Sequence, residues 1–565
     1  MKRALREWTL PEPQGDGAES AFARVTRSRG TTPELALAAS EAAGEEFDPR
    51  LLADMDRAVE LVRVALEQDE LIAIYGDYDA DGVTACALLV RAFRAAGREP
   101  LAYIPQRESE GYGLNSEALV ELRRQGASLV ITVDCGTTAV EVVKGRPKGL
   151  KLIITDHHLP HAEVGTGRVE LAPADALVNP QRPDDRYPFK GLAGVGVAYK
   201  LVRALEAVAL VPEGTAAAQL PLVALGTVAD MMPLQDENRW LVRQGLRAWP
   251  DQAPLGLALL AKSAGVDGTP TSGNLGFGLA PRINAAGRMD DAWLALRCCL
   301  ADDPGEAKEV AARLESLNQT RRSSLALALT SARGTVEEMP DELPAIVLGS
   351  SEISPGVVGL VAGRLAEEYG RPAFVYSRTG DQWRGSARGV PGLNVVEALR
   401  QCADHLLSYG GHLSAGGFSL APEEAAVAGF EATLAEAVRE QLGARQPLRA
   451  FRVDAEVRLR ECGLELGDEL LLLQPYGTGN PAVLLCASGC TVVRTESLGK
   501  TGGHLKVILS DPTGSAEAIS FNRPHLRAHL PEGRKVDALF ELEVDCWRGR
   551  RKPRLLLRDL RPARL

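Results

Sequence analysis

Three short apolar runs, each followed at once by acidic or imidazole side chains, constrain the fold of this chain more than any other feature. The runs cover residues 71–74, 129–133 and 152–154, and the polar stretches cover residues 75–82, 133–136 and 155–158. Short apolar runs bounded by turn residues are typical of buried parallel strands. Because ligand groups collect at the carboxyl ends of such strands, the pattern predicts an α/β fold with these polar side chains at one sheet edge.

The same side chains predict a metal site. They are Asp77, Asp79, Asp81, Asp134, Asp156, His157 and His158. Taken singly, each stretch also fits an ordinary turn or helix cap. Together, the carboxylates would repel one another and lose hydration unless a cation lay among them. Oxygen ligands with imidazoles and no thiolate favour Mn²⁺ or Mg²⁺, and two such ions ~3.5–4 Å apart suit phosphoryl hydrolysis. Asp134, by its central position, is the expected bridge between two ions.

Composition excludes several other classes of protein. With 565 residues, 45% hydrophobic and 25% charged, the chain is expected to form about three or four globular domains. It has no apolar run near the ~20 residues of a membrane span and no signal peptide in its first twenty residues. Nine cysteines without a spacing framework indicate a reducing, cytoplasmic location. The net charge of −11 is not typical of a nucleic-acid binder, but residues 491–565 carry 15 Lys and Arg against 9 Asp and Glu.

Strand and helix patterns predict the order of domains. Strands alternate with helices from residue 50, Asp303-Pro304 starts a helix expected to end near Ala332, and a second α/β unit begins near Ala345. Short strands follow, at residues 451–457, 505–509, 516–521, 536–547 and 554–560, and predict a barrel of the OB-fold type. We predict a loosely attached N-terminal extension, a catalytic parallel-sheet domain, a helical region with a long connecting helix, a substrate-binding α/β domain and an OB-fold domain. Their expected boundaries are 1–49, 50–240, 241–338, 339–446 and 447–565.

Four motifs, at residues 75–82, 133–136, 156–158 and 229–230, resemble the motifs of the DHH phosphoesterase superfamily. The tripeptide Asp156-His157-His158 is the one that names it. Within the superfamily, the chain is similar to the RecJ family of bacterial 5′→3′ single-strand-specific DNA exonucleases. The residues that carry this second resemblance are 75–82, 110–113, 281–288, 317–322, 410–417, 475–481 and 504–506. The likeness covers about residues 50–560 and implies a DHH domain, a DHH-associated domain and an OB domain in that order.

The resemblance implies roles for the acidic residues. Two Mn²⁺ or Mg²⁺ ions would be held by Asp79, Asp81, Asp134, His157 and Asp230, with Asp77 assisting. The predicted catalytic residues are His158, Asp134 and Asp156, with His158 orienting the scissile phosphate or protonating the leaving oxygen. Some relatives have a histidine where Tyr75 stands, which implies that one ion is held loosely.

The resemblance also implies a substrate-binding set. Ser386, Arg388 and His412 match positions that grip substrate phosphates. Further candidates are Arg107 and Arg282 for phosphates, Tyr112 for base stacking, and Asn284 in the cleft between domains. Where the family commonly has Trp-His, this chain has Ile353-Ser354, so Ser354 is expected to cap the following helix near an anion site.

The predicted function is metal-dependent 5′→3′ hydrolysis of single-stranded DNA to 5′-mononucleotides, in DNA repair and recombination. By analogy, the enzyme is expected to be a cytoplasmic monomer, without a membrane, that works beside a helicase and a single-strand-binding protein. Two alternatives stay open: a DHH phosphodiesterase for short oligoribonucleotides or cyclic dinucleotides, and a non-catalytic nucleic-acid-binding factor. Some members of the family carry a further C-terminal domain, so both a short form and a truncated chain are compatible with an end at Leu565.

Overall fold

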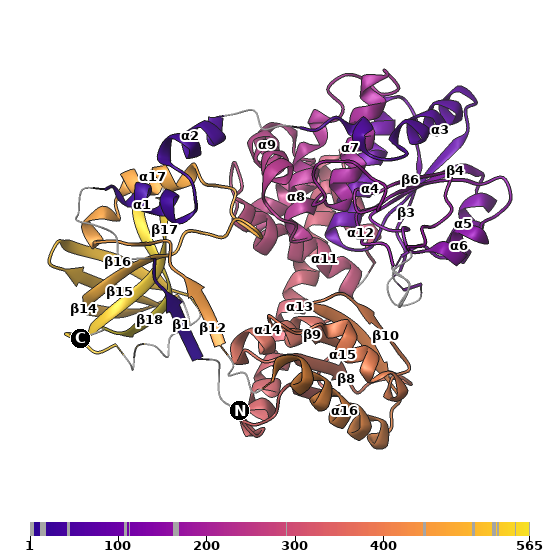
Figure 1. Cartoon of the computed structure of the whole chain (residues 1–565). Coiled ribbons are helices and arrows are strands. Elements are labelled where there is room, and N and C mark those ends of the chain that lie inside the picture. Colours follow the sequence, from indigo (N-terminus) through magenta and orange to yellow (C-terminus); the bar gives the residue numbers. More distant parts are fainter. Residues whose placement is uncertain are drawn as a thin grey trace. The chain divides into compact units, whose positions relative to one another are not determined.

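The computed structural model shows two compact units (Figure 1). The structure describes residues 5–11, 19–41, 46–106, 110–111, 113–161, 169–289, 291–443, 448–499, 503–521, 527, 530–547 and 550–563. The first unit comprises the described residues between Glu45 and Pro447 together with Gly477–Asn480. The second comprises those between Leu5 and Gly44, Leu448–Tyr476 and those from Pro481 onward. In the described part of the chain, no helix is both long and apolar enough to cross a bilayer.

A parallel five-stranded sheet forms the start of the first unit, as the apolar runs predict. Its strand order is β3-β2-β4-β5-β6, and every neighbouring pair is parallel. The strands are β2 (Leu71–Tyr75), β3 (Leu101–Tyr103), β4 (Ala127–Val133), β5 (Lys151–Thr155) and β6 (Ala176–Val178). Almost all residues of β2, β4 and β5 are buried, because helices cover both faces of such a sheet. The carboxyl ends of the three strands therefore meet at one edge.

Helices surround this sheet and extend into an all-helical region. Those around the sheet are η1 (Pro49–Leu51), α3 (Met55–Glu67), α4 (Ala80–Ala95), α5 (Ser116–Arg124), α6 (Val140–Lys144), α7 (Gly194–Ala207), η2 (Ala217–Gln219) and α8 (Leu220–Ala229). Those of the helical region are α9 (Asp236–Gln252), α10 (Leu255–Ser263), the π-helix η3 (Asn274–Leu279), α11 (Ala280–Met289), α12 (Trp293–Leu300) and α13 (Pro304–Glu338).

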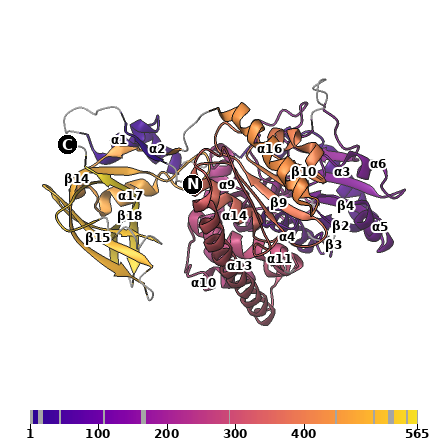
Figure 2. The same ribbon diagram turned by 90° about the horizontal axis from the view of Figure 1, so that it is seen from below.

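The long helix α13 starts as predicted and ends later than predicted. Asp303 is its N-cap and accepts a hydrogen bond from the amide of Glu306. The helix passes Gly334 because Ala332 and Val336 are buried in the core of the next domain, and this packing outweighs the helix cost of one glycine. Along its length α13 packs on α10, α11 and α14 (Figure 2).

The second α/β domain has a mixed five-stranded sheet of order β10-β11-β9-β8-β7. Only β7 and β8 are parallel, and the other described neighbours are antiparallel. Its strands are β7 (Ile346–Ser350), β8 (Ala373–Ser377), β9 (Trp383–Arg388), β10 (Ser408–Gly411) and β11 (Ala415–Leu420). Its helices are α14 (Val358–Tyr369), α15 (Val395–Gln401), η4 (Ala403–His405) and α16 (Glu424–Leu442).

The second unit contains the predicted OB-fold barrel. Strands β14, β15, β16, β18 and β17 follow one another in the sheet, and pairing of β14 with β17 closes the barrel. The elements are β12 (Leu448–Arg452), β13 (Ala455–Glu456), η5 (Leu459–Glu461), α17 (Leu464–Leu471), β14 (Leu485–Leu498), β15 (His504–Asp511), β16 (Gly514–Ser520), β17 (Lys535–Trp547) and β18 (Arg550–Pro562). The sequence-based strand assignment missed β14. Gly489 interrupts its apolar pattern with a φ of 65°, at the point where the register with β17 shifts.

The expectation of a loosely attached N-terminal segment is wrong for its described part. The segment forms β1 (Leu5–Thr9), α1 (Ala21–Ser28) and α2 (Pro33–Glu41). Strand β1 pairs in parallel with β12, and Phe22 and Val25 of α1 lie in the core of the barrel. The described residues up to Glu41 therefore belong to the second unit, whereas the five domain boundaries given above stay predictions.

Candidate active site

The carboxyl edge of the parallel sheet brings most of the predicted metal ligands together. Asp77 and Asp79 follow β2, Asp134 follows β4, and His157 follows β5. Asp230 is the C-cap of α8 and reaches the same place from outside the sheet. Ligand atoms lie within 4.8 Å of one another in three overlapping groups. The groups are Asp77, Asp79 and Asp134; Asp81, His157 and Asp230; and Asp134, His157 and His158.

Asp134 belongs to two of these three groups and is held in place by its backbone. Its φ of 62° lies in the left-handed region, which Asp tolerates better than most residues. Its amide donates a 2.9 Å hydrogen bond to the Thr155 carbonyl, which ties the β4 turn to β5. The side chain is buried, and burial together with the carboxylates of Asp81 and Asp79 raises the pKa of Asp134 well above its ordinary value.

His157 faces Asp134 in the form that binds a metal. Burial and the neighbouring imidazole of His158 lower the pKa of His157 to about 4, so its ring is neutral at neutral pH. Its Nε2 lies 3.1 Å from Asp134 Oδ1 and 3.6 Å from Asp230 Oδ2. Both Nε2 and Asp134 Oδ1 are buried atoms without a hydrogen-bond partner among the described residues. Two buried acceptors aimed at the same space fit a cation between them.

Asp81 is held by the N-terminus of α7, a contact that the sequence analysis did not anticipate. Its two carboxylate oxygens accept hydrogen bonds from the amides of Gly194, at 2.7 Å, and Val195, at 2.9 Å. Glycine is required at 194, because a Cβ there would lie 2.6 Å from the Asp134 side chain. The Gly-Val-Gly-Val sequence at the start of this helix was the available signal.

Burial raises the pKa values of Asp81 and Asp230 as well. Burial and repulsion from Asp79 raise the pKa of Asp81 to about 7, although the two amide hydrogen bonds oppose the shift. Burial and the carboxylates of Asp81 and Asp79 raise the pKa of Asp230 to about 8. Carboxylates crowded to this degree are stable in the ionised form when a cation neutralises them.

The loop after β2 is fixed at both ends. Asp79 is the N-cap of α4 and accepts hydrogen bonds from the amides of Asp81 and Gly82. Asn284 of α11 accepts a 2.8 Å hydrogen bond from the Ala80 amide. The structure places the carbonyl oxygen of Asn284 on the backbone of the acidic loop, and the predicted contact of this residue with substrate stays a prediction.

The donor set of this centre fits Mn²⁺ or Mg²⁺. The three groups supply carboxylate oxygens and imidazole nitrogens, and none of the described residues in them is a cysteine. Hard oxygen donors with one or two imidazoles are the ligands that these ions accept. Asp77, Asp79, Asp81, Asp134, His157 and Asp230 thus offer a donor set that suits a divalent cation, and their assignment as its ligands stays a prediction.

Asp156 does not point into the ligand groups but holds His158. One of its oxygens accepts hydrogen bonds from the His157 and His158 amides and lies 2.8 Å from His158 Nδ1. The other accepts from the Thr137 amide at 2.9 Å. Burial alone would raise the pKa of Asp156, but the His158 contact and these hydrogen bonds hold it below its ordinary value. At His158 burial acts against the charged ring, but the Asp156 contact outweighs it and the pKa rises to about 9.

Asn179 is a second residue that the sequence analysis missed. It follows β6, and its side-chain amide donates to Thr137 Oγ1 at 2.8 Å and to the His158 carbonyl at 2.9 Å. Asn179 therefore ties the end of strand β6 to the Asp156–His158 pair. A polar residue after a short apolar strand, at 176–178, was the sequence signal for it.

The second α/β domain supplies three predicted phosphate contacts, two of which line one cavity. The His412 ring is stacked near His158, with centroids 6.1 Å apart. Arg388 Nη1 donates to Ser386 Oγ at 3.1 Å, and no carboxylate partner is found for Arg388 in the described part of the chain. Ser386 and Arg388 line a cavity of about 610 Å³ together with residues of α11, α14, β10 and β11. A partly buried guanidinium and a hydroxyl at one cavity wall suit a phosphate.

Other predicted contacts are placed elsewhere. The Nε of Arg282 pairs with Glu315 of α13 and its Nη1 donates to the Gly278 carbonyl, so two of its three nitrogens have partners within the helical region. Ser354 is not the cap of α14, because the N-cap is Val357 and no side chain caps that end. Arg107 and Tyr112 lie outside the described residues. The Tyr75 hydroxyl donates to the Gly113 carbonyl and accepts from Asn115. These contacts do not test whether one ion is held loosely where some relatives have a histidine, so that expectation stays a prediction.

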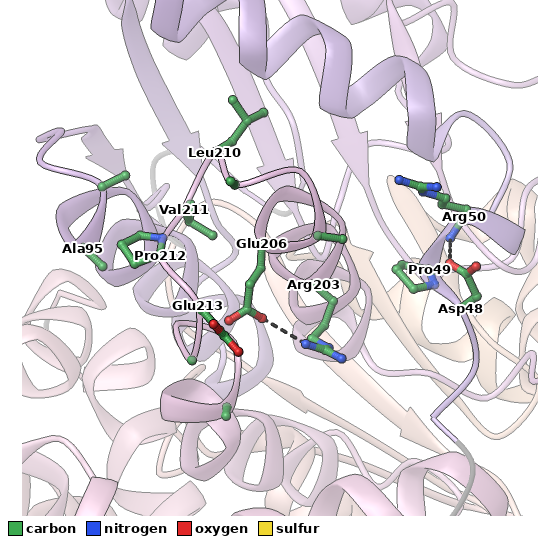
Figure 3. Close-up of a pocket in the computed structure, with 15 residues that line it drawn as sticks. Asp48, Pro49, Arg50, Ala95, Arg203, Glu206, Leu210, Val211, Pro212 and Glu213 are labelled. Carbon is green, nitrogen blue, oxygen red and sulfur yellow. Dashed lines mark hydrogen bonds and ion pairs between the residues drawn. The ribbon is translucent and has the colours of Figure 1, made fainter.

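A larger cavity, of about 1180 Å³, is formed near η1 and the ends of α4 and α7 (Figure 3). None of the described residues that line it is a predicted site residue. Two of its charged side chains, Arg203 and Glu206, pair with each other. The acidic edge of the sheet is therefore the better candidate for chemistry.

Family models match three regions of the chain. They are the DHH family N-terminal domain at residues 71–227, the DHHA1 domain at 342–440 and the RecJ OB domain at 453–559. These matches agree with the predicted order of a DHH domain, a DHH-associated domain and an OB domain.

Relatives and solved structures agree with these models. The single-stranded-DNA-specific exonuclease RecJ of Bacillus subtilis is 33% identical over 99% of this chain and 71% of its own length. The protein of that name from Dickeya dadantii is 34% identical over 91% of this chain and 92% of its own length. The crystal structure of Thermus thermophilus RecJ with Mn²⁺ matches with a TM-score of 0.80, at 31% identity over 99% of this chain and 80% of that one. A structure of RecJ from the same source with Mg²⁺ gives a TM-score of 0.74. The chain therefore belongs to the RecJ family.

Proposed function

We propose that this chain is a metal-dependent exonuclease that hydrolyses single-stranded DNA in the 5′→3′ direction and releases 5′-mononucleotides. The observation that carries the proposal is the position of His158 between the carboxylate–imidazole centre and the His412 ring. A phosphodiester between these two walls would meet metal ligands on one side and phosphate-binding groups on the other. Relatives named as single-stranded-DNA-specific exonucleases support the choice of substrate.

In this proposal the six ligands would hold Mn²⁺ or Mg²⁺, with Asp134 as the carboxylate that belongs to two of the three ligand groups. Divalent ions at such a centre supply a water of lowered pKa and stabilise negative charge on phosphate oxygens. Asp81 is kept in place by the α7 amides, and Asp79 by its cap contacts, so the ligands need little reorganisation when substrate binds.

His158 is the residue that we assign to proton transfer. Its contact with Asp156 favours the protonated ring up to pH about 9, so at neutral pH it is a cation with a proton to donate. A protonated His158 can bind a non-bridging oxygen of the scissile phosphate or protonate the departing 3′-oxygen. Asp156 is a positioning residue in this scheme, because it acts through His158.

Ser386 and Arg388 are assigned to a phosphate of the terminal nucleotide. Arg388 is partly buried, which lowers its pKa but leaves it charged, and its hydrogen bond to Ser386 orients both donors toward the cavity. Holding the strand end here would place the first internucleotide phosphodiester at the metal centre and would set the 5′→3′ direction. The OB-fold barrel, with its local excess of basic residues, is assigned to the strand that follows.

We extend the proposal to a role in DNA repair and recombination, in the cytoplasm, as a monomer beside a helicase and a single-strand-binding protein.

The test of the catalytic claim is the Asp134→Ala variant. It should lose Mn²⁺-dependent hydrolysis of single-stranded DNA by at least about 10³-fold and keep its affinity for the strand. Substantial remaining turnover in this variant would exclude Asp134 as a shared ligand.

A further inference from the structure

The cavity that holds Ser386 and Arg388 extends beyond them along the sheet. Arg384 of β9, Ser408 of β10 and Ser419 of β11 also line it. None of these three was singled out by motif or by family resemblance. They lie on three adjacent strands, and their arrangement follows from the strand register.

The register places the three residues in one row across the sheet. Ser419 is the cross-strand partner of both Arg384 and Ser408. The next row consists of Ser386, Gly417 and Gly410, and Arg388 is paired with Ala415 in the row after that. Directly opposed residues project from the same face, and residues two apart along a strand do so as well. The three rows therefore share one face, with successive rows about 6.8 Å apart, which is two residues at about 3.4 Å each.

The order of the rows relative to the acidic centre is also fixed. The His412 amide donates to the Ala415 carbonyl at 2.7 Å, and the His412 ring lies near His158. The Arg388 row is thus the inner one, and the Arg384 row is the outer one. The middle row leaves unoccupied space beside the backbone at Gly410, because a Cβ added there would meet no atom within 4 Å.

Charge favours an anion in the outer row. Arg384 is exposed and has neither an ion pair nor a hydrogen bond in the described part of the chain. Two other arginines of the same domain are paired, Arg378 with Glu424 and Arg364 with Glu367. The described residues lining the cavity include three arginines and no carboxylate, and the N-terminal turn of the twelve-residue helix α14 faces the same space.

We propose that Arg384, Ser408 and Ser419 form an outer subsite for a second phosphoryl group, beyond the one held at Ser386 and Arg388. The inference rests on the proposed function, since it extends the path of the same strand end. Two sources can supply that phosphoryl group. One is a strand threaded one nucleotide further, which would yield a 5′-phosphorylated dinucleotide, and the other is a 5′-triphosphate end.

Binding tests the subsite without relying on turnover. Strands of one sequence that carry a 5′-hydroxyl, a 5′-monophosphate or a 5′-triphosphate are titrated by fluorescence anisotropy against the Asp134→Ala protein, alone and with Arg384→Gln added. We expect the triphosphorylated strand to bind roughly tenfold more tightly than the monophosphorylated one, and Arg384→Gln to remove that difference. Arg364→Ala is the matched control on the same domain and should leave the ratio unchanged.

Product analysis of the active enzyme in Mn²⁺ distinguishes the two sources. Dinucleotides from the monophosphorylated strand that decline in Arg384→Gln would assign the subsite to a threaded strand. A triphosphate preference without dinucleotides would assign it to the polyphosphate end. Equal affinities for all phosphorylated ends, with no dinucleotide and no effect of Arg384→Gln, would overturn the subsite. A wild-type protein that cleaves no strand would instead overturn the proposed function, and the binding ratio would still decide the subsite.

Discussion

His158 Nδ1 lies 2.8 Å from Asp156 Oδ1, and the same carboxylate oxygen accepts the backbone amides of both His157 and His158. The aspartate of the Asp-His-His tripeptide is therefore an orienting group, while His157 turns toward Asp134 and His158 toward His412. One short sequence serves the metal centre with one imidazole and the substrate side with the other.

Asp156→Asn should change the pH dependence of turnover. The carboxylate raises the pKa of His158 to about 9, and its loss should bring that pKa back toward the ordinary value of 6.5. His158 would then be mostly neutral at pH 8.5 but still largely protonated at pH 6. We expect kcat to fall by about 10²-fold at pH 8.5 and far less at pH 6. An equal loss at both values would contradict a role for Asp156 through the protonation of His158.

Gly194→Ala should disable the centre without unfolding the protein. The new methyl group would lie 2.6 Å from the Asp134 side chain and would displace it. A ligand moved by about 1 Å is expected to cost about 10²-fold in turnover. Gly334→Ala in α13 is the control, because its methyl group meets no atom within 4 Å and should only strengthen the helix. Full activity in Gly194→Ala would show that the close approach of α7 to Asp134 is not required.

The metal-free protein should lose stability as pH rises from 6.5 to 8.5. In that window the pKa values of Asp81 and Asp230 are raised to about 7 and about 8, and that of His158 to about 9. A group whose pKa is higher in the folded protein than in the unfolded chain contributes stability at pH values below its unfolded pKa. That contribution is lost as the pH rises through its folded pKa. His157, with its pKa lowered to about 4, is neutral in the folded protein throughout this window. In the unfolded chain its imidazole is still partly protonated near pH 6.5, so His157 contributes a small rise in stability at the start of the window, which the three raised groups outweigh.

Thermal melts in EDTA and in Mn²⁺ measure this effect. We expect Tm in EDTA to be lower at pH 8.5 than at pH 6.5, and the increase on adding Mn²⁺ to be larger at pH 8.5, where the ligands are ionised. A Tm in EDTA that rises over this range would contradict the crowding of carboxylates at the sheet edge.

Trp8→Ala should destabilise the barrel unit. Trp8 is buried, its indole N–H donates to Asp559 at 2.8 Å, and the Arg561 guanidinium lies 4.2 Å from the ring centroid. Loss of a buried tryptophan costs about 3–5 kcal/mol of unfolding free energy. Trp293, which is 40% exposed, is the control. If chemical denaturation showed equal effects for Trp8→Ala and Trp293→Ala, the N-terminal strand would not be an integral part of the second unit.

The sequence was most informative where local pattern and chemistry coincide. The apolar strands and the acidic turns after them are both local, so the sheet edge with Asp77, Asp134 and His157 could be predicted. Strand β14 could not, because Gly489 and a register shift break its pattern.

Contacts between distant segments were the other gap. The α7 amides that hold Asp81 lie 113 residues away along the chain, and the bond from Ala80 to Asn284 spans 204 residues. Arg282 is another case: its pairing with Glu315 depends on how α11 and α13 pack, which a motif does not reveal, and its contact with substrate stays a prediction. Tertiary packing thus decides which polar residues of a motif face a ligand and which support the fold.

End-labelled DNA tests the central claim most directly. A single-stranded oligonucleotide labelled at its 5′ end is incubated with the protein in Mn²⁺, in parallel with the same strand labelled at its 3′ end. The account predicts immediate release of labelled mononucleotide from the first strand and gradual shortening of the second, both abolished by Asp134→Ala. Release of labelled mononucleotide first from the 3′ end, or cleavage that Asp134→Ala leaves intact, would contradict it.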